Sequence, residues 1–364
     1  MLGSYRSQVA LAIALGALFT VGCDGDTTQT TSGTGGQGGE TTSTSTTGGS
    51  GGTTTSTSST GGTGGGLTCE NNEGVVLAVT SLSFGEGDSG QWKSVGYNLD
   101  GLETTAVSKD VCQPNSGAAT STPYPDGDMG IDNSFGKNLV PLILSLYPTW
   151  VDDVNNGIQK GIFTSLLKLD CVPPTGDVPS FTSRLYGATD LGTAPKFDGT
   201  DQWPVAPELL SDPNDPFSST VIFAGSSIKD NLYDSGPNQT YILTVPLKTQ
   251  TQTTSIKLTL YAARTTMTLA EDRKSATSGT IGGVVNTEDV VAEVKKIGAL
   301  LDLCDTAILD SMLSQVRQAS DIMADGTQDP NQTCDGISIG LKFEMKEAQI
   351  GSVGPASPVG DSCL

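Results

Sequence analysis

Apolar and polar residues alternate over much of the chain after residue 70, and this period of two predicts strands. The clearest case is "ISIGLKFEMK", residues 337–346, where Ile, Ile, Leu, Phe and Met hold every second position. The residues between them are Ser, Gly, Lys, Glu and Lys, so we expect a half-buried strand with one solvated face. Shorter patterns predict strands at 75–84, 162–169, 181–186 and 220–224.

Residues 240–285 predict an antiparallel meander. Apolar residues alternate at 241–247 and at 256–260, and the next stretch indicates two strands around a polar turn at 271–275. Consecutive strands joined by short turns usually pair with each other, so these segments are expected to be neighbours in one sheet. A shorter alternation at 94–99 predicts one more strand.

Four segments show the 3.6-residue apolar spacing of amphipathic helices instead. The strongest runs from 287 to about 304, and Asn286 or Thr287 can cap its first turn. The other three cover about 306–323, about 134–146 with Pro141 inside it, and 149–159.

The order of these elements predicts the fold class. The strands occur in runs and the helices are grouped at 134–159 and 287–323, without a regular alternation of the two. This order predicts an α+β fold that is mainly antiparallel β, built as a sandwich or a large twisted sheet with a few packed helices.

The first residues have the pattern of an export signal. An apolar run of about 13 residues, Val9–Val21, is shorter than the ~20 needed to cross a bilayer as a helix. Gly22 and Cys23 follow it, and this stretch resembles the lipobox of bacterial lipoproteins. The resemblance implies a signal peptide at 1–22, cleavage before Cys23, and a lipid on the Cys23 thiol. An ordinary signal peptide followed by an incidental cysteine is the alternative.

Residues 23–66 are expected to form a disordered tether behind this lipid. They consist almost entirely of Thr, Ser and Gly, with loose repeats such as "TTSTSTTGGSGG" and no aromatic residue. Such a segment cannot bury enough apolar surface to offset its chain entropy. A flexible coil of this length spans roughly 35–40 Å, enough to hold a folded domain away from a membrane surface.

Residues 67–364 are then the folded part, long enough to bury a sizeable core. The chain carries a net charge of −21, so we expect no nucleic-acid partner. Besides Cys23 there are six cysteines, and none has the CxxC spacing of zinc or thioredoxin-like sites. Six cysteines in an oxidising compartment can form three disulfides, and we predict Cys304–Cys334 as one of them because they flank a helical stretch.

The chain contains no histidine, and this excludes more chemistry than any motif suggests. There can be no Ser-His-Asp triad, no Cys-His pair and no imidazole metal ligand. The stretch "GDSG" at 87–90 is similar to the nucleophile segment of chymotrypsin-type proteases, but no histidine can accept the hydroxyl proton. We interpret it as a polar turn.

The stretch "YPDGDMGIDNSFG" holds the one candidate metal site. Asp126, Asp128 and Asp132 are separated by glycines, as in the first part of DxDxDG calcium loops. Ca²⁺ takes six to eight oxygen ligands, and a glycine-rich acidic loop can wrap around it. The alternative is a turn in which Asp132 or Asn133 caps the following helix.

These features predict a lipid-anchored protein of the cell envelope with a non-catalytic binding or structural role. The long tether predicts the outer membrane as its location. Its partners would be the membrane, through the lipid, and an envelope component, glycan or protein. Two alternatives are an extracellular polysaccharide hydrolase using Asp and Glu, and a carrier of apolar molecules. A cleft with two facing carboxylates and a tryptophan would favour the hydrolase, and an apolar internal cavity would favour the carrier.

Overall fold

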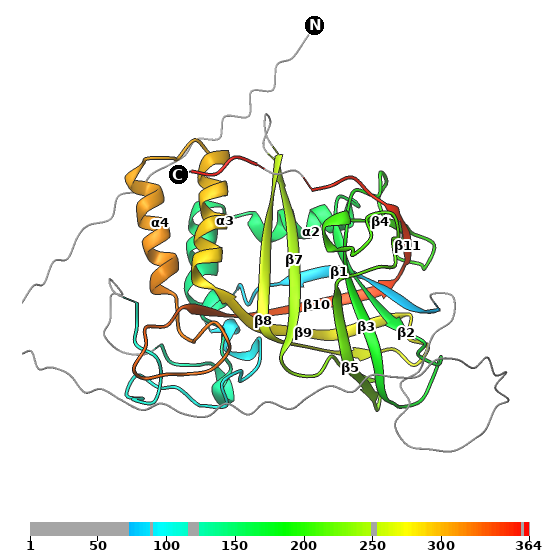
Figure 1. Cartoon of the computed structure of the whole chain (residues 1–364), viewed down its shortest axis with the longest axis horizontal. Coiled ribbons are helices and arrows are strands. Elements are labelled where there is room, and N and C mark those ends of the chain that lie inside the picture. Colours follow the sequence, from blue (N-terminus) through cyan, green and yellow to red (C-terminus); the bar gives the residue numbers. More distant parts are fainter. Residues whose placement is uncertain (1–72, 88–89, 116–123, 249–252, 358–359, 364) are drawn as a thin grey trace, which may run out of the picture. The chain divides into compact units, whose positions relative to one another are not determined.

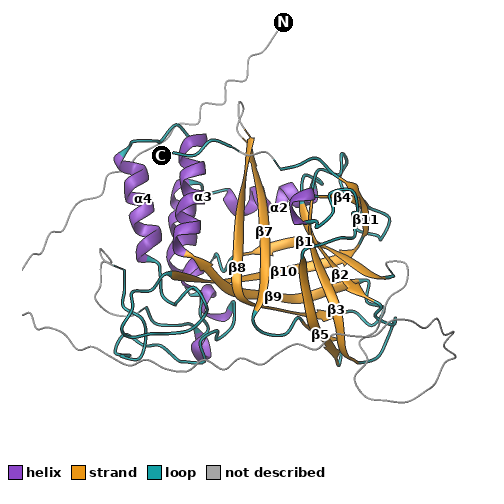
Figure 2. Ribbon diagram, viewed as in Figure 1, coloured by secondary structure: helices purple, strands orange, loops and turns teal. Residues whose placement is uncertain are grey.

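The computed structural model describes residues 73–87, 90–115, 124–248, 253–357 and 360–363. The predicted signal peptide, Cys23 and the tether lie outside the described residues. Within the described part, strands account for most of the regular structure (Figures 1 and 2).

Eleven strands form one sheet (Figure 1). Their bounds are β1 (Gly74–Ser83), β2 (Thr164–Asp170), β3 (Val178–Ala188), β4 (Gln202–Val205), β5 (Val221–Lys229), β6 (Leu232–Asp234), β7 (Gln239–Lys248), β8 (Thr253–Leu269), β9 (Ser275–Asn286), β10 (Gly336–Glu347) and β11 (Gln349–Val353). The sequence patterns place most of these strands within a few residues of their observed bounds.

Eight of the strands close on themselves. Neighbours follow the order β3-β2-β1-β10-β9-β8-β6-β5, and β5 then pairs with β3. Every pair around this ring, which we call the closed sheet, is antiparallel. The predicted class, α+β with mainly antiparallel strands, is confirmed, and it takes the form of one large sheet.

The remaining strands attach to the outside of this ring. β4 pairs with β3 and carries the parallel strand β11, while β7 pairs with β8 as the first arm of the predicted meander. Large side chains fill the core, as expected for a ring of eight strands. Leu77, Phe223, Tyr233, Leu260 and Ile339 are fully buried members of one contiguous apolar cluster.

Helices occur where the apolar spacing predicts them (Figure 2). They are α1 (Val140–Leu146), α2 (Trp150–Gln159), α3 (Thr287–Leu300) and α4 (Ala307–Gln318). Asn286 caps α3, and its side chain accepts hydrogen bonds from the backbone N–H groups of Glu288 and Asp289. A π-helical turn at Phe135–Leu139 precedes α1, where Pro141 occupies the first turn and so needs no helical hydrogen-bond acceptor.

Two local predictions are wrong. Residues 94–99 do not form a strand, since only Tyr97 makes a single bridge, to Asp132, and Gly96 has a φ of 126°. α4 ends at Gln318 and not near 323, because Ile322 is buried beside Gly336 at the start of β10. Both differences lie where loops pack against the closed sheet.

The outer face of β10 is also more buried than the alternation of apolar and polar residues predicts. Lys342, Glu344 and Lys346 are exposed as expected, but Ser338 and Gly340 are buried. The first half of the strand therefore has both faces covered, one by the core and the other by loops. These loops form the candidate site below.

The predicted Cys304–Cys334 disulfide is wrong. Cys304 is bonded to Cys363, and Cys334 to Cys112. Residues 319–334 lead away from α4 to the segment of Cys112, where the N–H group of Cys334 donates to the carbonyl oxygen of Gln113. Cys304 instead lies near Cys363, whose N–H group donates to the carbonyl oxygen of Lys295 in α3.

We predict that removing the Cys112–Cys334 disulfide will destabilise the protein substantially. This bond joins residues 222 positions apart, so it restricts the unfolded chain strongly. The double variant Cys112→Ser/Cys334→Ser is expected to lose roughly 2–5 kcal/mol of unfolding free energy, measured by chemical denaturation. Non-reducing peptide mapping supplies the check on pairing: a linked Cys304–Cys334 peptide from the native protein would contradict the assignment.

Candidate functional site

Three chain segments gather at one end of the closed sheet, beneath α3 and α4 in Figure 1, where they are drawn in cyan and orange. They are residues 90–115, 124–134 and 319–335, and we call them the loop module. They are joined by hydrogen bonds, one disulfide and a group of aspartates.

Asn133 attaches the loop module to the sheet. Its side-chain nitrogen donates to the carbonyl oxygens of Trp92 and Val95, at 3.3 and 3.0 Å. Its side-chain oxygen accepts from the backbone N–H groups of Gly136 and of Gly340 in β10, at 2.9 and 3.0 Å. One buried amide thus links three separate parts of the chain, a role beyond the helix cap that the sequence suggested.

Glycines in the sheet permit this close approach. A Cβ at Gly340 would lie 2.1 Å from the carbonyl oxygen of Val95, and a Cβ at Gly282 in β9 would lie 2.6 Å from the ring of Tyr97. Any larger residue at either position would push the loop module off the strands. The hydroxyl group of Tyr97 donates to the carbonyl oxygen of Thr280 and accepts a hydrogen bond from the hydroxyl group of Thr266.

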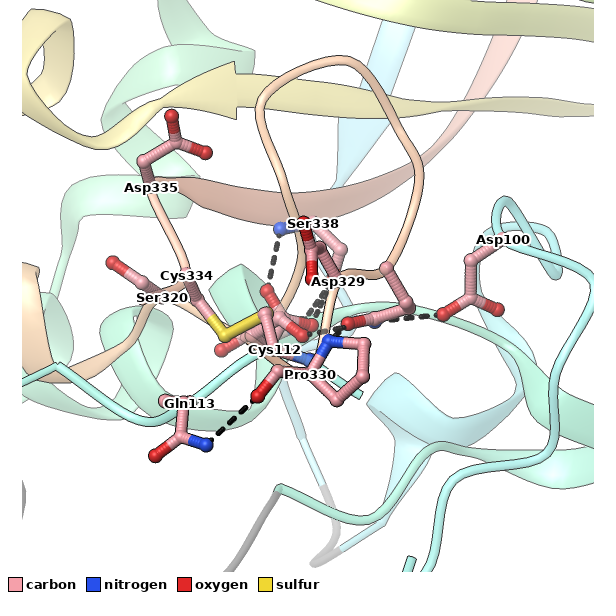
Figure 3. Close-up of a disulfide and its surroundings, with 12 residues drawn as sticks. Asp100, Cys112, Gln113, Ser320, Asp329, Pro330, Cys334, Asp335 and Ser338 are labelled. Carbon is pink, nitrogen blue, oxygen red and sulfur yellow. Dashed lines mark hydrogen bonds between the residues drawn. A yellow bond between two sulfur atoms is a disulfide. The ribbon is translucent and has the colours of Figure 1, made fainter. Parts of the chain in front are cut away.

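The Cys112–Cys334 disulfide fastens the other side of the loop module (Figure 3). Around it, the Gln113 side chain donates to the carbonyl oxygen of Pro330 at 2.8 Å. The Gln328 side chain accepts from the N–H group of Cys112 and donates to Asp100, both at 2.8 Å. Residues 319–335 are therefore held to residues 90–115 by covalent and polar contacts together.

Four aspartates come together inside the loop module. Asp132 accepts a hydrogen bond from the N–H group of Leu99 at 2.7 Å, and Asp126 accepts one from that of Thr104. Asp321 accepts from the N–H group of Ser338 in β10 at 2.9 Å. Asp100, the fourth, accepts from the N–H group of Leu102 and from Gln328.

The pKa values of three of these carboxyl groups, those of Asp126, Asp132 and Asp321, are raised. Burial is the largest cause for each, and charge repulsion within the group adds to it. The pKa of Asp126 is raised to about 6, that of Asp321 to about 7 and that of Asp132 to about 9. Asp132 is the most affected because its side chain is almost fully buried and the charges of Asp100 and Asp321 act on it.

One lysine lies close to this group. Nζ of Lys137 lies 4.9 Å from the ring centre of Trp92 and 5.6 Å from that of Tyr124, and it donates to the carbonyl oxygen of Pro125. Burial lowers the pKa of Lys137, while Asp321 and Asp126 act to raise it. The ammonium group of Lys137 therefore interacts both with two aromatic rings and, through its charge, with the carboxyl groups of Asp126 and Asp321.

The structure brings together two of the three predicted calcium ligands. Asp126 and Asp132 belong to the aspartate group, whereas the side chain of Asp128 is exposed on a short 3₁₀ turn. Among the described residues, no set of three or more acidic, cysteine or histidine side chains is arranged to hold a metal ion. Sequence reasoning missed Asp100 and Asp321, because each lies in a separate loop with no local signal.

A shallow hollow lies on the surface of residues 323–335. It has a volume of about 540 Å³. Most of its lining residues are polar, and the apolar ones are Met323, Ala324 and Pro330. Its acidic residues already have partners: Asp325 accepts from Thr327, and Asp335 from the N–H group of Ala324. Its lining contains no aromatic side chain that could stack on a ligand.

Comparison of the chain with known proteins brings no further assignment. Neither the family models, nor the curated proteins, nor the solved structures contain a match to it. In the part of the chain that the structure describes, none of the helices has the length and apolar character needed to span a membrane.

From the raised pKa values of the aspartate group we predict that the free energy of unfolding falls as pH rises. Asp126, Asp132 and Asp321 keep protons in the folded protein at pH values where the unfolded chain has released them, so raising the pH above about 4 favours unfolding until each folded pKa is passed. We expect Asp132→Asn, which keeps an acceptor for Leu99, to remove about 1–3 kcal/mol of the stability loss between pH 5 and pH 8.

Urea denaturation in a chelating buffer at several pH values measures this effect. Asp128→Asn is the matched control, because the Asp128 side chain is exposed, and it should follow the native pH profile. Identical profiles for the native protein and Asp132→Asn would contradict the assigned burial of charge.

Loss of the Asn133 amide is expected to destabilise the loop module. Asn133→Ala leaves the N–H group of Gly340 and the carbonyl oxygen of Val95 without these partners. We expect a loss of about 2–4 kcal/mol in thermal or chemical unfolding. Asn331→Ala, at an exposed turn, should cost less than about 0.5 kcal/mol. Equal effects from the two substitutions would show that Asn133 is not the attachment point.

Proposed function

We propose that this protein is a lipid-anchored protein of the bacterial cell envelope whose acidic folded domain has a non-catalytic binding or structural role. The lipobox-like stretch ending at Cys23 would supply the anchor, and the tether at 23–66 would carry the domain away from the membrane. The outer membrane is the proposed location, since so long a tether suits a displayed domain.

Disulfide bonding supports export of the folded domain. Each cysteine in the described part of the chain, including Cys171, is disulfide-bonded. Disulfides persist in secreted and periplasmic proteins and are rare in the reducing cytosol. Cys23 is the candidate for lipid attachment because it directly follows the lipobox-like stretch.

The hydrogen bonds of three aspartates of the loop module are the observation that supports a non-catalytic role. Asp126, Asp132 and Asp321 have the most strongly raised carboxyl pKa values among the described residues, and such groups are candidates for general acids or bases. Each of them accepts a hydrogen bond from a backbone N–H group of another segment. Their main task is therefore to join loops to one another and to the sheet.

The two alternatives have less support. A polysaccharide hydrolase needs two opposed carboxyl groups beside a sugar-binding surface, but the hollow at 323–335 has no aromatic residue. Trp203 is fully buried in the core, and the half-buried ring of Trp92 is occupied by the ammonium group of Lys137. A carrier of apolar molecules needs an open interior, whereas large side chains such as Phe223 and Tyr233 occupy the core of the closed sheet. A partner in the envelope, a glycan or a protein, suits the acidic surface better than nucleic acid does.

Changing Cys23→Ser tests the anchor. If a lipid is attached at this residue, the variant should move from the membrane fraction to the soluble fraction after cell breakage, while the native protein stays with membranes. Asp128→Asn serves as the control, because it changes an exposed residue of the folded domain and leaves Cys23 intact. A Cys23→Ser variant that still sediments with membranes would contradict the proposal, as would a mature terminus without fatty acid in mass spectrometry.

A further inference from the structure

We propose that the Cys304–Cys363 disulfide is a redox-sensitive latch, which a dithiol reductant opens in the folded protein. Opening it would release the residues that follow β11, 354–357 and 360–363, from α3 and α4. We call these residues the latch segment. The proposal goes beyond the binding or structural role above, and it stands whether or not Cys23 carries a lipid.

The latch segment is held to the helices at one point. Cys363 is the one buried residue among 354–357 and 360–363, and Figure 1 shows this end of the chain beside α3. Its N–H group donates to the carbonyl oxygen of Lys295 in α3 at 3.3 Å. Its Sγ lies 3.3 Å from the position that a Cβ would take at Gly298. Without the disulfide, a long hydrogen bond and one small side chain would remain to hold the segment against α3.

Closing the latch segment has a cost at Thr254, the second residue of β8. Thr254 is 1 % exposed, and its Oγ1 has no hydrogen-bond partner among the described residues. Gly360 lies close to it, since a Cβ at Gly360 would be 2.4 Å from this Oγ1. A buried hydroxyl group without a partner has lost the hydrogen bonds that it makes with water. Release of the segment would return water to Thr254, which favours the open form.

Access to solvent distinguishes this bond from the one in the loop module. Cys304 is exposed on the turn between α3 and α4, so a reductant can reach it directly. Cys112 and Cys334 are only 2 % and 3 % exposed, and a reductant reaches them only after the loop module opens. Thiol–disulfide exchange requires direct attack on one sulfur atom, so access decides which bond reacts first. Cys304 offers the accessible sulfur.

A dithiol balances the reaction. One of its thiolates attacks Sγ of Cys304, the bond to Cys363 breaks, and Cys363 leaves as a thiolate. The second thiolate of the dithiol then attacks the resulting mixed disulfide, which frees Cys304 and oxidises the dithiol to its own disulfide. Two electrons pass from the dithiol to the protein, and the two protons of the dithiol reach the two cysteines through solvent.

The surroundings of the latch select the charge of the reductant. Cys304 lies between the exposed residues Asp302 and Asp305, and exposed Asp361 is two positions before Cys363. These negative charges repel an anionic thiolate reagent and attract one that carries positive charge. The reductant that fits this site is therefore a dithiol with basic groups beside its reactive thiol.

Timed reduction of the full-length protein in detergent tests the access argument. Dithiothreitol is added at about pH 8 without denaturant, excess N-ethylmaleimide stops the reaction, and mass spectrometry maps the labelled peptides. Cys304 and Cys363 should be labelled together, at least about tenfold sooner than Cys112 and Cys334. Equal rates or the reverse order would overturn the proposal. Cys171 is mapped as a separate peptide and does not enter this comparison.

Hydrogen exchange distinguishes a latch from a bond that only stabilises the fold. After selective reduction, backbone amides of the latch segment should exchange at least about tenfold faster, while those of β10 stay unchanged. Cys304→Ser/Cys363→Ser should show the same pattern without reductant, which excludes an effect of the label on Cys363. An unchanged latch segment, or faster exchange throughout the closed sheet, would contradict the release. Either result leaves the membrane fractionation of Cys23→Ser untouched, so the two proposals fail independently.

Two small thiols of opposite charge test the choice of reductant. At equal thiolate concentration and low ionic strength, cysteamine should reduce Cys304–Cys363 at least about threefold faster than 2-mercaptoethanesulfonate, and about 0.5 M NaCl should shrink the difference. Asp302→Asn/Asp305→Asn should remove most of it. Asn tolerates the left-handed backbone of both residues, whose φ values are 57° and 58°. Asp128→Asn is the matched control and should keep the difference. Equal rates with the two thiols in the native protein would overturn the selection of a basic reductant.

Discussion

The side-chain amide of Asn133 makes the hydrogen bonds on which the position of the loop module depends. Through one buried side chain it connects β10 of the closed sheet with the segment at Trp92 and Val95 and with the turn that leads into α1. The contact exists only because Gly340 lets the backbone of Val95 lie directly on the strand. The positions of Asp132, next in the chain, and of the whole aspartate group follow from it.

This attachment has an energetic consequence. Holding the loops against the sheet buries the carboxyl group of Asp132 and places Asp126 and Asp321 nearby, where their charges disfavour ionisation of Asp132. Backbone N–H groups and Lys137 offset part of this cost, and the Cys112–Cys334 disulfide keeps the segments together in spite of it. A region that combines buried carboxyl groups with a disulfide is one that protonation stabilises.

Much of the fold could be predicted from the sequence, because it depends on local periodicity. The alternation at 337–346 and the meander at 240–285 correspond to β10 and to β7, β8 and β9, and the cap at Asn286 lies where expected. The closure of the sheet through β3 and β5 depends on contacts between distant residues, which no local pattern reports. The same reason explains the wrong disulfide, because Cys112 and Cys363, the partners of Cys334 and Cys304, are brought beside them only by the tertiary fold.

The candidate site shows the same limit. Asp126 and Asp132 could be selected from their glycine-rich loop, but Asp100, Thr104 and Asp321 join them only through the tertiary fold. Carbon-13 NMR titration of the aspartate carboxyl groups, without divalent cations, tests the central claim that charge is buried here. The account predicts at least one aspartate with a midpoint well above pH 6, as for Asp132. Midpoints near pH 4 for every aspartate would contradict it.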